Sequence, residues 1–531
     1  MSMASAFFFN LKKRKKIFYF IILLIFSISF NQYYGNIGVF PEDTFLTFNS
    51  GYDTLNGYYP FKDYYTTTGP FLDLLQAIFF KILGVTWFSY VFHASIINFL
   101  ITIATFHTLN KFNLNINFCF FYSFLVAILA YPTSGTPFMD HHSTYISIIS
   151  IFTFILAIKT KSNFYWFILP FIVGSAFLSK QVPAGYIFLI ISFLSIIYFY
   201  FNFEIKKFFI SLLGALIFII SFILILSIGE ISLISFFQQY ILFPQTLGAS
   251  RLELLFPLDF TRVFLRFKLQ HLSLLLVVVL IIQQTIKNIK YLKSDECLIV
   301  LSLIFTGFAL IVLELMTINE KFIFFIIPIF TGFSHIYYEK YFKHHKFILY
   351  FLILLSLSSA TWYYYNYIDS RKFLSLDKVT IKNTVDAKIL NERFMNLKWV
   401  NVLYPADPKK EIINLKKAIE IIRNDKRNKT IVTDYQFVSA FLGVYDNSPN
   451  RVWHEGANYP FENNKYYNLY KKFFINKLKE NKVEIIYTLS PLWGDDSDNI
   501  LKPLSDKKCV KKTVITNILN SYFIKDCADL K

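Results

Sequence analysis

Glycine, tryptophan and cysteine are scarce in this chain: its 531 residues include 17 Gly, 6 Trp and 4 Cys, against 64 Phe and 35 Tyr. Four cysteines in so long a chain exclude a small disulfide-rich scaffold. Charged residues are also few, at 17%, whereas apolar residues reach 55% and the mean hydropathy is +0.45. A membrane-spanning helix needs about 20 mostly apolar residues, and residues 1–370 contain many such runs. This pattern excludes a soluble α/β enzyme and predicts a polytopic α-helical membrane protein.

No cleavage site for a secretory signal follows the first apolar run, because the segment NQYYGN lacks small residues of the A-x-A kind. We therefore expect this run to remain as the first membrane helix. About eleven spans are expected in all. They lie roughly at 17–32, 88–108, 116–132, 143–159, 164–180, 184–202, 208–228, 270–286, 297–316, 321–338 and 347–366.

The positive charge of the chain is unevenly distributed. The formal net charge is +18, from 53 basic and 35 acidic residues. In a soluble protein this excess would favour nucleic acid as a partner, but here the basic residues occupy alternate short loops. They are residues 12–16, Lys111, Lys159, Lys161, Lys206, Lys207, Lys287, Lys290, Lys293, Lys340, Lys343 and Lys346. This positive-inside pattern predicts a protein of the bacterial cytoplasmic (inner) membrane with a cytoplasmic N-terminus, an outer C-terminal end and no nucleic-acid partner.

Residues 371–531 contain no run long enough to span a membrane. Helical periodicity at 409–425 and 466–482 alternates with strand-like apolar segments at 429–435 and 483–490. This alternation predicts a small α/β extracytoplasmic domain after a transmembrane domain at 1–370. Cys509 and Cys527 both lie in this second domain, and we expect them to form a disulfide, which persists in an oxidising compartment.

The first outer loop, residues 33–87, is too long and too patterned for a simple connection, since most loops have about 4–6 residues. Soon after the first span it carries two adjacent carboxylates, Glu42 and Asp43. One interpretation is a catalytic base at the membrane surface. The other is a pair of acids in the first turn of a helix, where the helix dipole favours negative charge.

Further along this loop, Tyr59 and Asp63 lie in an aromatic stretch that ends at the Gly69-Pro70 turn. The structural interpretation is an interfacial loop followed by an amphipathic helix on the bilayer surface. A substrate-binding role for Asp63 is compatible with it.

Asp140, His141 and His142 begin the fourth span. Neighbouring residues on a helix point about 100° apart, so adjacent histidines rarely ligate the same ion. We therefore predict a hydrogen-bonding or acid role near a cavity and no dedicated metal site, with a divalent cation left open as a cofactor.

Cations also lie beside apolar runs on the predicted outer side. Lys180 with Gln181, and Glu320 with Lys321, stand at the ends of spans. A lysine at membrane depth costs about 2.5–3.5 kcal/mol on insertion scales and is usually functional. An anionic lipid phosphate is the expected partner, and snorkelling of the side chain to the surface is the alternative.

These features together resemble the GT-C membrane glycosyltransferases, in particular the protein O-mannosyltransferase and aminoarabinose transferase group (glycosyltransferase family 39-like). The similar motifs are Glu42-Asp43, the GYYP segment at 57–60 with Asp63, Gly69-Pro70, Lys180-Gln181 and the NEKF segment at 319–322. Two departures stand out. Lys321 and Phe322 replace an Arg-Tyr pair, and Thr66–Thr68 occupy the place of a lysine that aminoarabinose transferases carry.

The resemblance implies transfer of a sugar from a polyprenyl-phosphate-linked donor to an acceptor hydroxyl at the outer face of the membrane, with inversion. Asp43 would act as the base, with Glu42 as the alternate. Lys180 and Lys321 would stabilise the phosphate leaving group, and the remaining site residues would bind substrate: Tyr59, Asp63, Asp140, His141, Gln181 and Glu320. Membrane lipids and a lipid, glycan or protein acceptor are the further expected partners.

Two other function classes stay open. Intramembrane charges also mark transporters or lipid flippases, although the internal repeat that many secondary transporters show is not evident here. A lipid-linked glycan polymerase or ligase would use arginines in long outer loops, and Arg251, Arg262 and Arg266 lie in such a loop.

Overall fold

The computed structural model describes residues 3–317, 322–492, 499–504, 509–525 and 527. Within these residues, ten helical segments are long and apolar enough to cross a membrane. They correspond to α1 (Met3–Gly35), α5 (Trp87–Lys111), α6 (Ile116–Leu129), α7 (Met139–Thr160), α9 (Gln181–Asn202), α10 (Ile205–Ile228), α13 (Lys268–Lys287), α14 (Asp295–Thr317), α15 (Ile326–Tyr337) and α16 (Lys346–Tyr363). The eleventh expected span is the shorter apolar helix α8 (Asn163–Ser179). The prediction of a polytopic helical membrane protein is confirmed.

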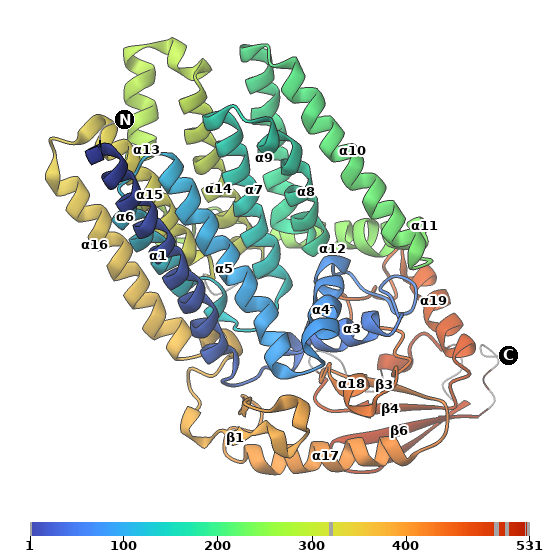
Figure 1. The fold of residues 1–531 in the computed structure, drawn as a ribbon. Helices are drawn as coiled ribbons and strands as arrows, with labels where there is room; N and C mark the ends of the chain where they lie inside the picture. The colour runs from blue at the N-terminus through green and yellow to red at the C-terminus, as the bar shows by residue number, and fades with distance from the viewer. Residues whose placement is uncertain (1–2, 318–321, 493–498, 505–508, 526, 528–531) are drawn as a thin grey trace.

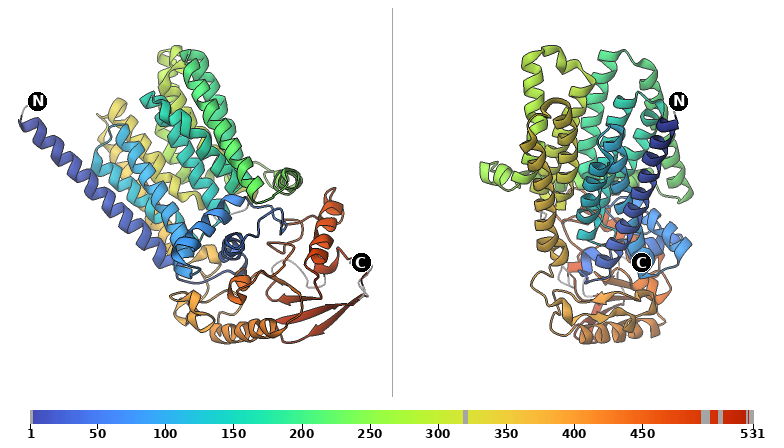
Figure 2. Two further views of the ribbon diagram at one scale, coloured as in Figure 1. Left: turned by 45° about the vertical axis from the view of Figure 1, so that its right-hand side comes forward. Right: turned by 60° about the vertical axis from the view of Figure 1, so that its left-hand side comes forward.

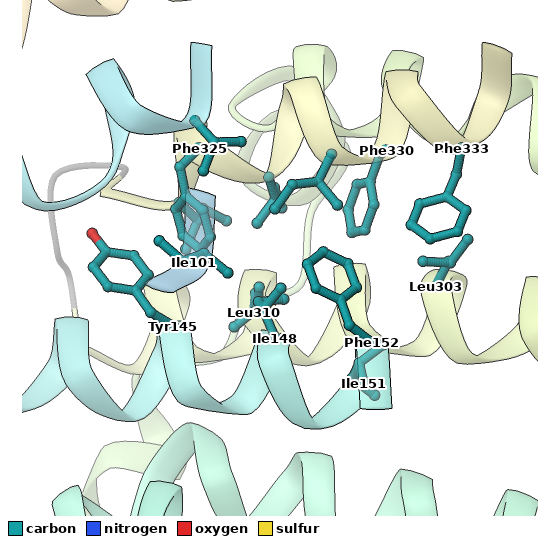
Figure 3. Packing of buried hydrophobic residues seen from close by; sticks show 14 of the residues in the cluster. Ile101, Tyr145, Ile148, Ile151, Phe152, Leu303, Leu310, Phe325, Phe330 and Phe333 are labelled. Atoms are coloured by element: carbon teal, nitrogen blue, oxygen red, sulfur yellow. The ribbon is translucent and has the colours of Figure 1, made fainter. Parts of the chain in front are cut away.

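Helix α7 lies at the centre of the bundle and α10 at its edge (Figure 1). Phe325, Phe330 and Phe333 face Tyr145 and Phe152 of α7 in the close-packed interior (Figure 3). By contrast, α10 exposes a nearly continuous apolar surface. Lipid tails are as apolar as these side chains, so this surface of α10 can face lipid without loss of free energy and does not need to be buried in protein.

The two ends of the bundle differ. The N-terminus lies at one end, and the C-terminal residues form a separate layer at the other (Figures 1 and 2). Between them lie the first outer loop, with α2 (Pro41–Thr44), α3 (Leu46–Leu55) and α4 (Pro70–Leu83), and the segment after α10, with α11 (Leu233–Phe236), η2 (Phe237–Leu242) and α12 (Phe243–Glu253). The short helical segments of the bundle are η1 (Tyr131–Thr133), η3 (Thr261–Leu265), η4 (Ile289–Lys293), η5 (Phe322–Phe325), η6 (Tyr338–Phe342) and η7 (Tyr364–Asp369).

The C-terminal layer is an α/β unit, as predicted. Its four-stranded sheet has the order β3-β4-β6-β5, in which β3 and β4 are parallel and the other pairs antiparallel. The elements are α17 (Pro408–Asn424), β3 (Lys429–Thr433), α18 (Val438–Leu442), α19 (Tyr467–Glu480), β4 (Ile485–Leu489), β5 (Val510–Val514) and β6 (Leu519–Ile524). A small ladder of β1 (Val385–Asp386) and β2 (Lys398–Trp399) precedes them, with short helical segments η8 (Lys372–Leu374), η9 (Ile381–Asn383), η10 (Ala387–Ile389), η11 (Glu392–Phe394) and η12 (Asn499–Leu501).

The predicted elements at 409–425, 429–435, 466–482 and 483–490 correspond to α17, β3, α19 and β4. The β5–β6 hairpin was not predicted. A disulfide joins Cys509, just before β5, to Cys527, just after β6, and so closes the open end of this hairpin.

A buried ion pair holds the C-terminal layer against the first outer loop. The Arg451 guanidinium lies 3.0 Å from the Asp73 carboxylate of α4, with side chains only 3% and 0% exposed. The same guanidinium donates to the carbonyl of Leu46 at 2.8 Å and to the Thr68 hydroxyl at 2.6 Å. It therefore fixes α3, α4 and the intervening loop at once.

A second buried arginine joins the end of the bundle to the outer loops. Arg371, just after η7, donates to the carbonyls of Ile37 at 3.1 Å, Pro132 at 2.8 Å and Ser134 at 2.9 Å. These carbonyls belong to the segment after α1 and to the loop between α6 and α7. The chain that leaves the last membrane helix is thus fastened to both loops.

We predict that Arg451→Met lowers the thermal stability of the detergent-solubilised protein strongly. The substitution leaves Asp73 buried without its cation, and removing one partner of such a pair costs about 3–5 kcal/mol. Lys388→Met is the matched control, because Lys388 and its partner Glu392 are exposed, and pairs of that kind contribute about 0–1 kcal/mol. Equal unfolding temperatures of the two variants would contradict this account of the interface.

Candidate functional site

A cavity of about 730 Å³ lies where the outer loops, the bundle and the C-terminal layer meet. Its polar wall combines residues far apart in the sequence: Glu42, Thr67, Thr68, Asp140, Lys180, Gln181, Arg251, His454 and Asn458. Its apolar wall comes from the membrane helices and from the segment after α10: Phe177, Val182, Tyr186, Ile241, Leu247, Leu252, Leu313 and Met316. The cavity therefore suits a ligand with one polar and one long apolar part.

Lys180 and Asp140 form an ion pair on the polar wall. Lys180 lies in the break between α8 and α9, and its ammonium is 2.5 Å from the carboxylate of Asp140 in the first turn of α7. The Ser143 hydroxyl donates to the Lys180 carbonyl at 3.0 Å and holds the break in place. Asp140 gives the cation a partner at a depth where an isolated charge would be costly.

The two adjacent carboxylates lie in the first turn of α2, which begins at Pro41. Glu42 lines the cavity, whereas its neighbour Asp43 is partly buried and is not among the described residues that line it. Burial raises the pKa of Asp43 to about 7; the negative charges of Glu42 and Asp140 add to this rise, and the positive charge of Lys180 opposes it. A carboxyl with a pKa near neutrality can hold or release a proton at physiological pH, as a general base requires.

His454 is a site residue that the sequence did not reveal as one. It belongs to the C-terminal layer, lines the cavity, and its Nδ1 lies 3.5 Å from Glu42 Oε1. No sequence motif pairs a histidine with a carboxylate more than 400 residues away. The pairing brings the C-terminal layer into the site.

Hydrogen bonds from Gln181 hold the loop that carries Thr66–Thr68 against the break between α8 and α9. The Gln181 side-chain amide donates to the carbonyls of Thr67 at 3.0 Å and Tyr240 at 2.6 Å. At Gly69, a Cβ atom would lie 1.7 Å from the Leu178 carbonyl oxygen, so only glycine fits. The Gly69-Pro70 turn therefore lets the first outer loop touch the membrane helices.

Other predicted site residues lie elsewhere. The Asp63 carboxylate accepts a hydrogen bond from the backbone N–H of Tyr59 at 2.7 Å, and its carbonyl accepts one from the Tyr445 hydroxyl at 3.1 Å. Asp63 thus closes its own turn beside the C-terminal layer, and neither it nor Tyr59 is among the described residues that line the cavity.

The two histidines after Asp140 are buried among other side chains. His141 is surrounded by aromatic rings, including those of Phe138, Tyr145 and Phe373. His142 forms hydrogen bonds with the Tyr131 hydroxyl and, at 2.9 Å, with His93 Nε2. In the described part of the chain, no group of three or more His, Cys, Asp or Glu residues is arranged to hold a metal ion. Glu320 and Lys321 lie outside the described residues.

Comparison with known proteins gives a similarity of fold. The chain is similar in structure to an archaeal oligosaccharyltransferase. Two structures of this protein, from Archaeoglobus fulgidus, align with 89% and 90% of the chain, covering 68% and 69% of theirs, at TM-scores of 0.42 and 0.44 and identities of 13% and 14%. One contains Zn and sulfate, and the other is tethered to an acceptor peptide with an NVT sequon. Neither the family models nor the curated proteins give a match.

We predict that Asp43→Asn makes the protein more stable at pH 8 but not at pH 4. The folded protein keeps a proton on Asp43 up to a pKa of about 7, whereas the ordinary value is 3.8. Because the folded state binds more protons between these values, its stability falls as the pH rises through this window. The neutral amide removes this loss.

Thermal unfolding of both proteins from pH 4 to pH 8 measures the effect. The control is Asp377→Asn, which changes an exposed carboxylate and should leave the pH profile as it is. If the wild type instead gained stability relative to Asp43→Asn as the pH rises, the folded protein would favour the ionised form of Asp43, and this account would be wrong.

Proposed function

We propose that this protein is a membrane glycosyltransferase that moves a sugar from a polyprenyl-phosphate-linked donor to an acceptor hydroxyl. The observation that carries the proposal is the cavity itself. Two carboxylates, Glu42 and Asp140, and two cations, Lys180 and Arg251, line the cavity, and apolar side chains of the membrane helices line it as well. A transfer site for a lipid-linked sugar needs each of these parts.

The donor's phosphate would bind beside Lys180 and Arg251. Both residues line the cavity, and charge-assisted hydrogen bonds from lysine and arginine to phosphate oxygens are strong. The polyprenyl chain would follow Tyr186, Leu313 and Met316 between the helices. This placement is supported by the break at Lys180, which delivers a cation to the end of an otherwise apolar segment.

The reaction would form one bond and break another at the anomeric carbon. Asp43, with Glu42 as the alternate, accepts the proton of the acceptor hydroxyl while the hydroxyl oxygen attacks the anomeric carbon and inverts it. The bond from that carbon to the phosphate oxygen breaks, and its electron pair leaves with the polyprenyl phosphate. Lys180 stabilises the charge that develops on this leaving group.

The acceptor would approach from the side of the C-terminal layer. His454 and Asn458 line the cavity from that side, and His454 faces Glu42. We propose that this side is the outer face of a bacterial inner membrane, with the N-terminus in the cytoplasm. The acceptor is a lipid, a glycan or a protein with a free hydroxyl.

The transfer can be tested in reconstituted vesicles with radiolabelled lipid-linked sugars. We expect free polyprenyl phosphate to be released from a polyprenyl-monophosphate sugar in step with labelling of the acceptor. A lipid-linked glycan polymerase or ligase would instead release a polyprenyl pyrophosphate, and a flippase would move the intact donor without releasing either product. Either of those results would overturn the proposed reaction.

We predict that Asp43→Asn lowers kcat of transfer by about 10²–10⁴-fold, the usual contribution of a positioned base. Glu42→Gln is the matched variant, because it removes the neighbouring charge without touching Asp43. It should lower kcat less and shift the pH–rate profile, since the Glu42 charge helps to raise the pKa of Asp43. If Asp43→Asn were fully active and Glu42→Gln inactive, Glu42 would be the catalytic base and Asp43 its neighbour.

We predict that Lys180→Met lowers kcat/KM by about 10²–10³-fold, as expected when a group that stabilises transition-state charge is removed. Lys180→Arg, which keeps the positive charge, should retain part of the activity. Lys62→Met serves as the control, because Lys62 pairs with exposed Glu230 on an outer loop. Transfer by Lys180→Met at the rate of the control would exclude Lys180 from the phosphate site.

A further inference from the structure

A second, much smaller polar cavity lies between α3 and the C-terminal layer, outside the site described above. Its volume is about 10 Å³, close to the space that one water-sized particle occupies. Oxygen-bearing side chains dominate its lining, among them Asn49, Asp53, Asp446, Ser448 and Asn450. The proposed transfer reaction uses none of them.

Two buried carboxylates face this cavity. Asp53 of α3 is 4% exposed and Asp446 of the C-terminal layer is 6% exposed. Among the described residues, neither has an ion-pair partner, because Arg451, which also lines the cavity, pairs with Asp73. When all are ionised, Asp53, Asp446 and Asp73 carry three negative charges against one positive charge on Arg451. The cluster is left with two uncompensated negative charges.

Several oxygen atoms of these residues also lack a partner. Within the described chain, Asn49 Oδ1, Asp53 Oδ1 and Asn450 Oδ1 are buried and receive no hydrogen bond. Their residues are 4%, 4% and 2% exposed. A buried polar atom without a partner loses free energy on folding, and the unpartnered oxygens of Asp53 and Asn450, two residues that line one small space, indicate a missing positive or hydrogen-bonding group.

The spacing of the polar atoms suits a cation. The side-chain nitrogen of Asn49 lies 3.4 Å from Asp53 Oδ2, 3.3 Å from Asp446 Oδ2 and 2.9 Å from Ser439 Oγ. The oxygen and nitrogen of an amide can be exchanged by a half-turn of the side chain. Turned in this way, Asn49 would place its oxygen about 3.4 Å from each carboxylate, which is the separation of adjacent ligands around Ca²⁺ at bond lengths of about 2.4 Å.

We propose that Asp53, Asp446, Asn49 and Asn450 bind one Ca²⁺ ion between the first outer loop and the C-terminal layer. All the donors are oxygens, which hard cations prefer over zinc or copper, and an ion of charge +2 balances the two uncompensated negative charges. Two of the ligands belong to α3 and two to the C-terminal layer. The ion therefore fastens the layer that carries His454 to the loop that carries Glu42.

Equilibrium dialysis with ⁴⁵Ca²⁺ tests the proposal on the full-length protein in detergent, after EDTA treatment. We expect one Ca²⁺ per chain, at least tenfold weaker binding to Asp53→Asn and to Asp446→Asn, and unchanged binding to the control Asp377→Asn, which alters an exposed carboxylate. Added CaCl₂ should also raise the unfolding temperature of the wild type.

The wild-type measurement alone can overturn the proposal, so it does not depend on the folding of the variants. Extracellular calcium modules bind Ca²⁺ with dissociation constants of up to about 10⁻³ M. Absence of bound Ca²⁺ at 1 mM CaCl₂ would therefore mean that water or protons fill the cavity. Binding of MgCl₂ in preference to CaCl₂ would refute the assignment of the ion. Equal Ca²⁺ binding to the wild type and to both Asp variants would place the ion elsewhere.

Discussion

The buried pair of Arg451 and Asp73 is the constraint on which the arrangement of the outer half depends. A charge removed from water needs an opposite charge and well-directed hydrogen bonds, or the fold loses several kcal/mol. Arg451 meets this requirement only in one position, where it also bonds the Leu46 carbonyl and the Thr68 hydroxyl. Leu46 begins the helix after α2, and Thr68 lines the cavity. One side chain of the C-terminal layer thus sets the position of both the carboxylates and the cavity wall.

The membrane half constrains the same cavity from the other side. The α8–α9 break places Lys180 beside Asp140, and Gln181 ties that break to Thr67 and Tyr240. Gly69 is required because the first outer loop approaches the Leu178 carbonyl more closely than any side chain permits. Hydrogen bonds and close packing therefore position the membrane wall of the cavity, and His454 and Asn458 of the C-terminal layer also line it. Neither half holds all the groups that the proposed reaction needs.

Local patterns in the sequence were sufficient for the spans and for four elements of the C-terminal layer, because apolar length and periodicity depend only on neighbouring residues. The sequence pattern did not predict the β5–β6 hairpin, because β5 exposes most of its side chains and carries two lysines. Asp63 is predicted to bind substrate, and in the structure its carboxylate closes a turn by accepting the Tyr59 N–H; an aspartate in either role looks the same in a sequence. His454 became recognisable only when the fold brought it to Glu42. Contacts between residues hundreds of positions apart leave no local pattern.

Charge balance explains why both halves must contribute to the proposed site. Glu42, Asp43 and Asp140 would repel an incoming phosphate if all three were ionised and unpaired. Lys180 cancels Asp140, the buried environment keeps Asp43 close to its protonated form, and Arg251 and His454 add donors along the wall. In the proposed reaction, the donor's phosphate would leave as an anion, and the proton taken up by Asp43 would offset the negative charge that the cavity gains. In the proposed reaction, the environment that raises the pKa of Asp43 to about 7 would let this carboxyl exchange a proton at neutral pH.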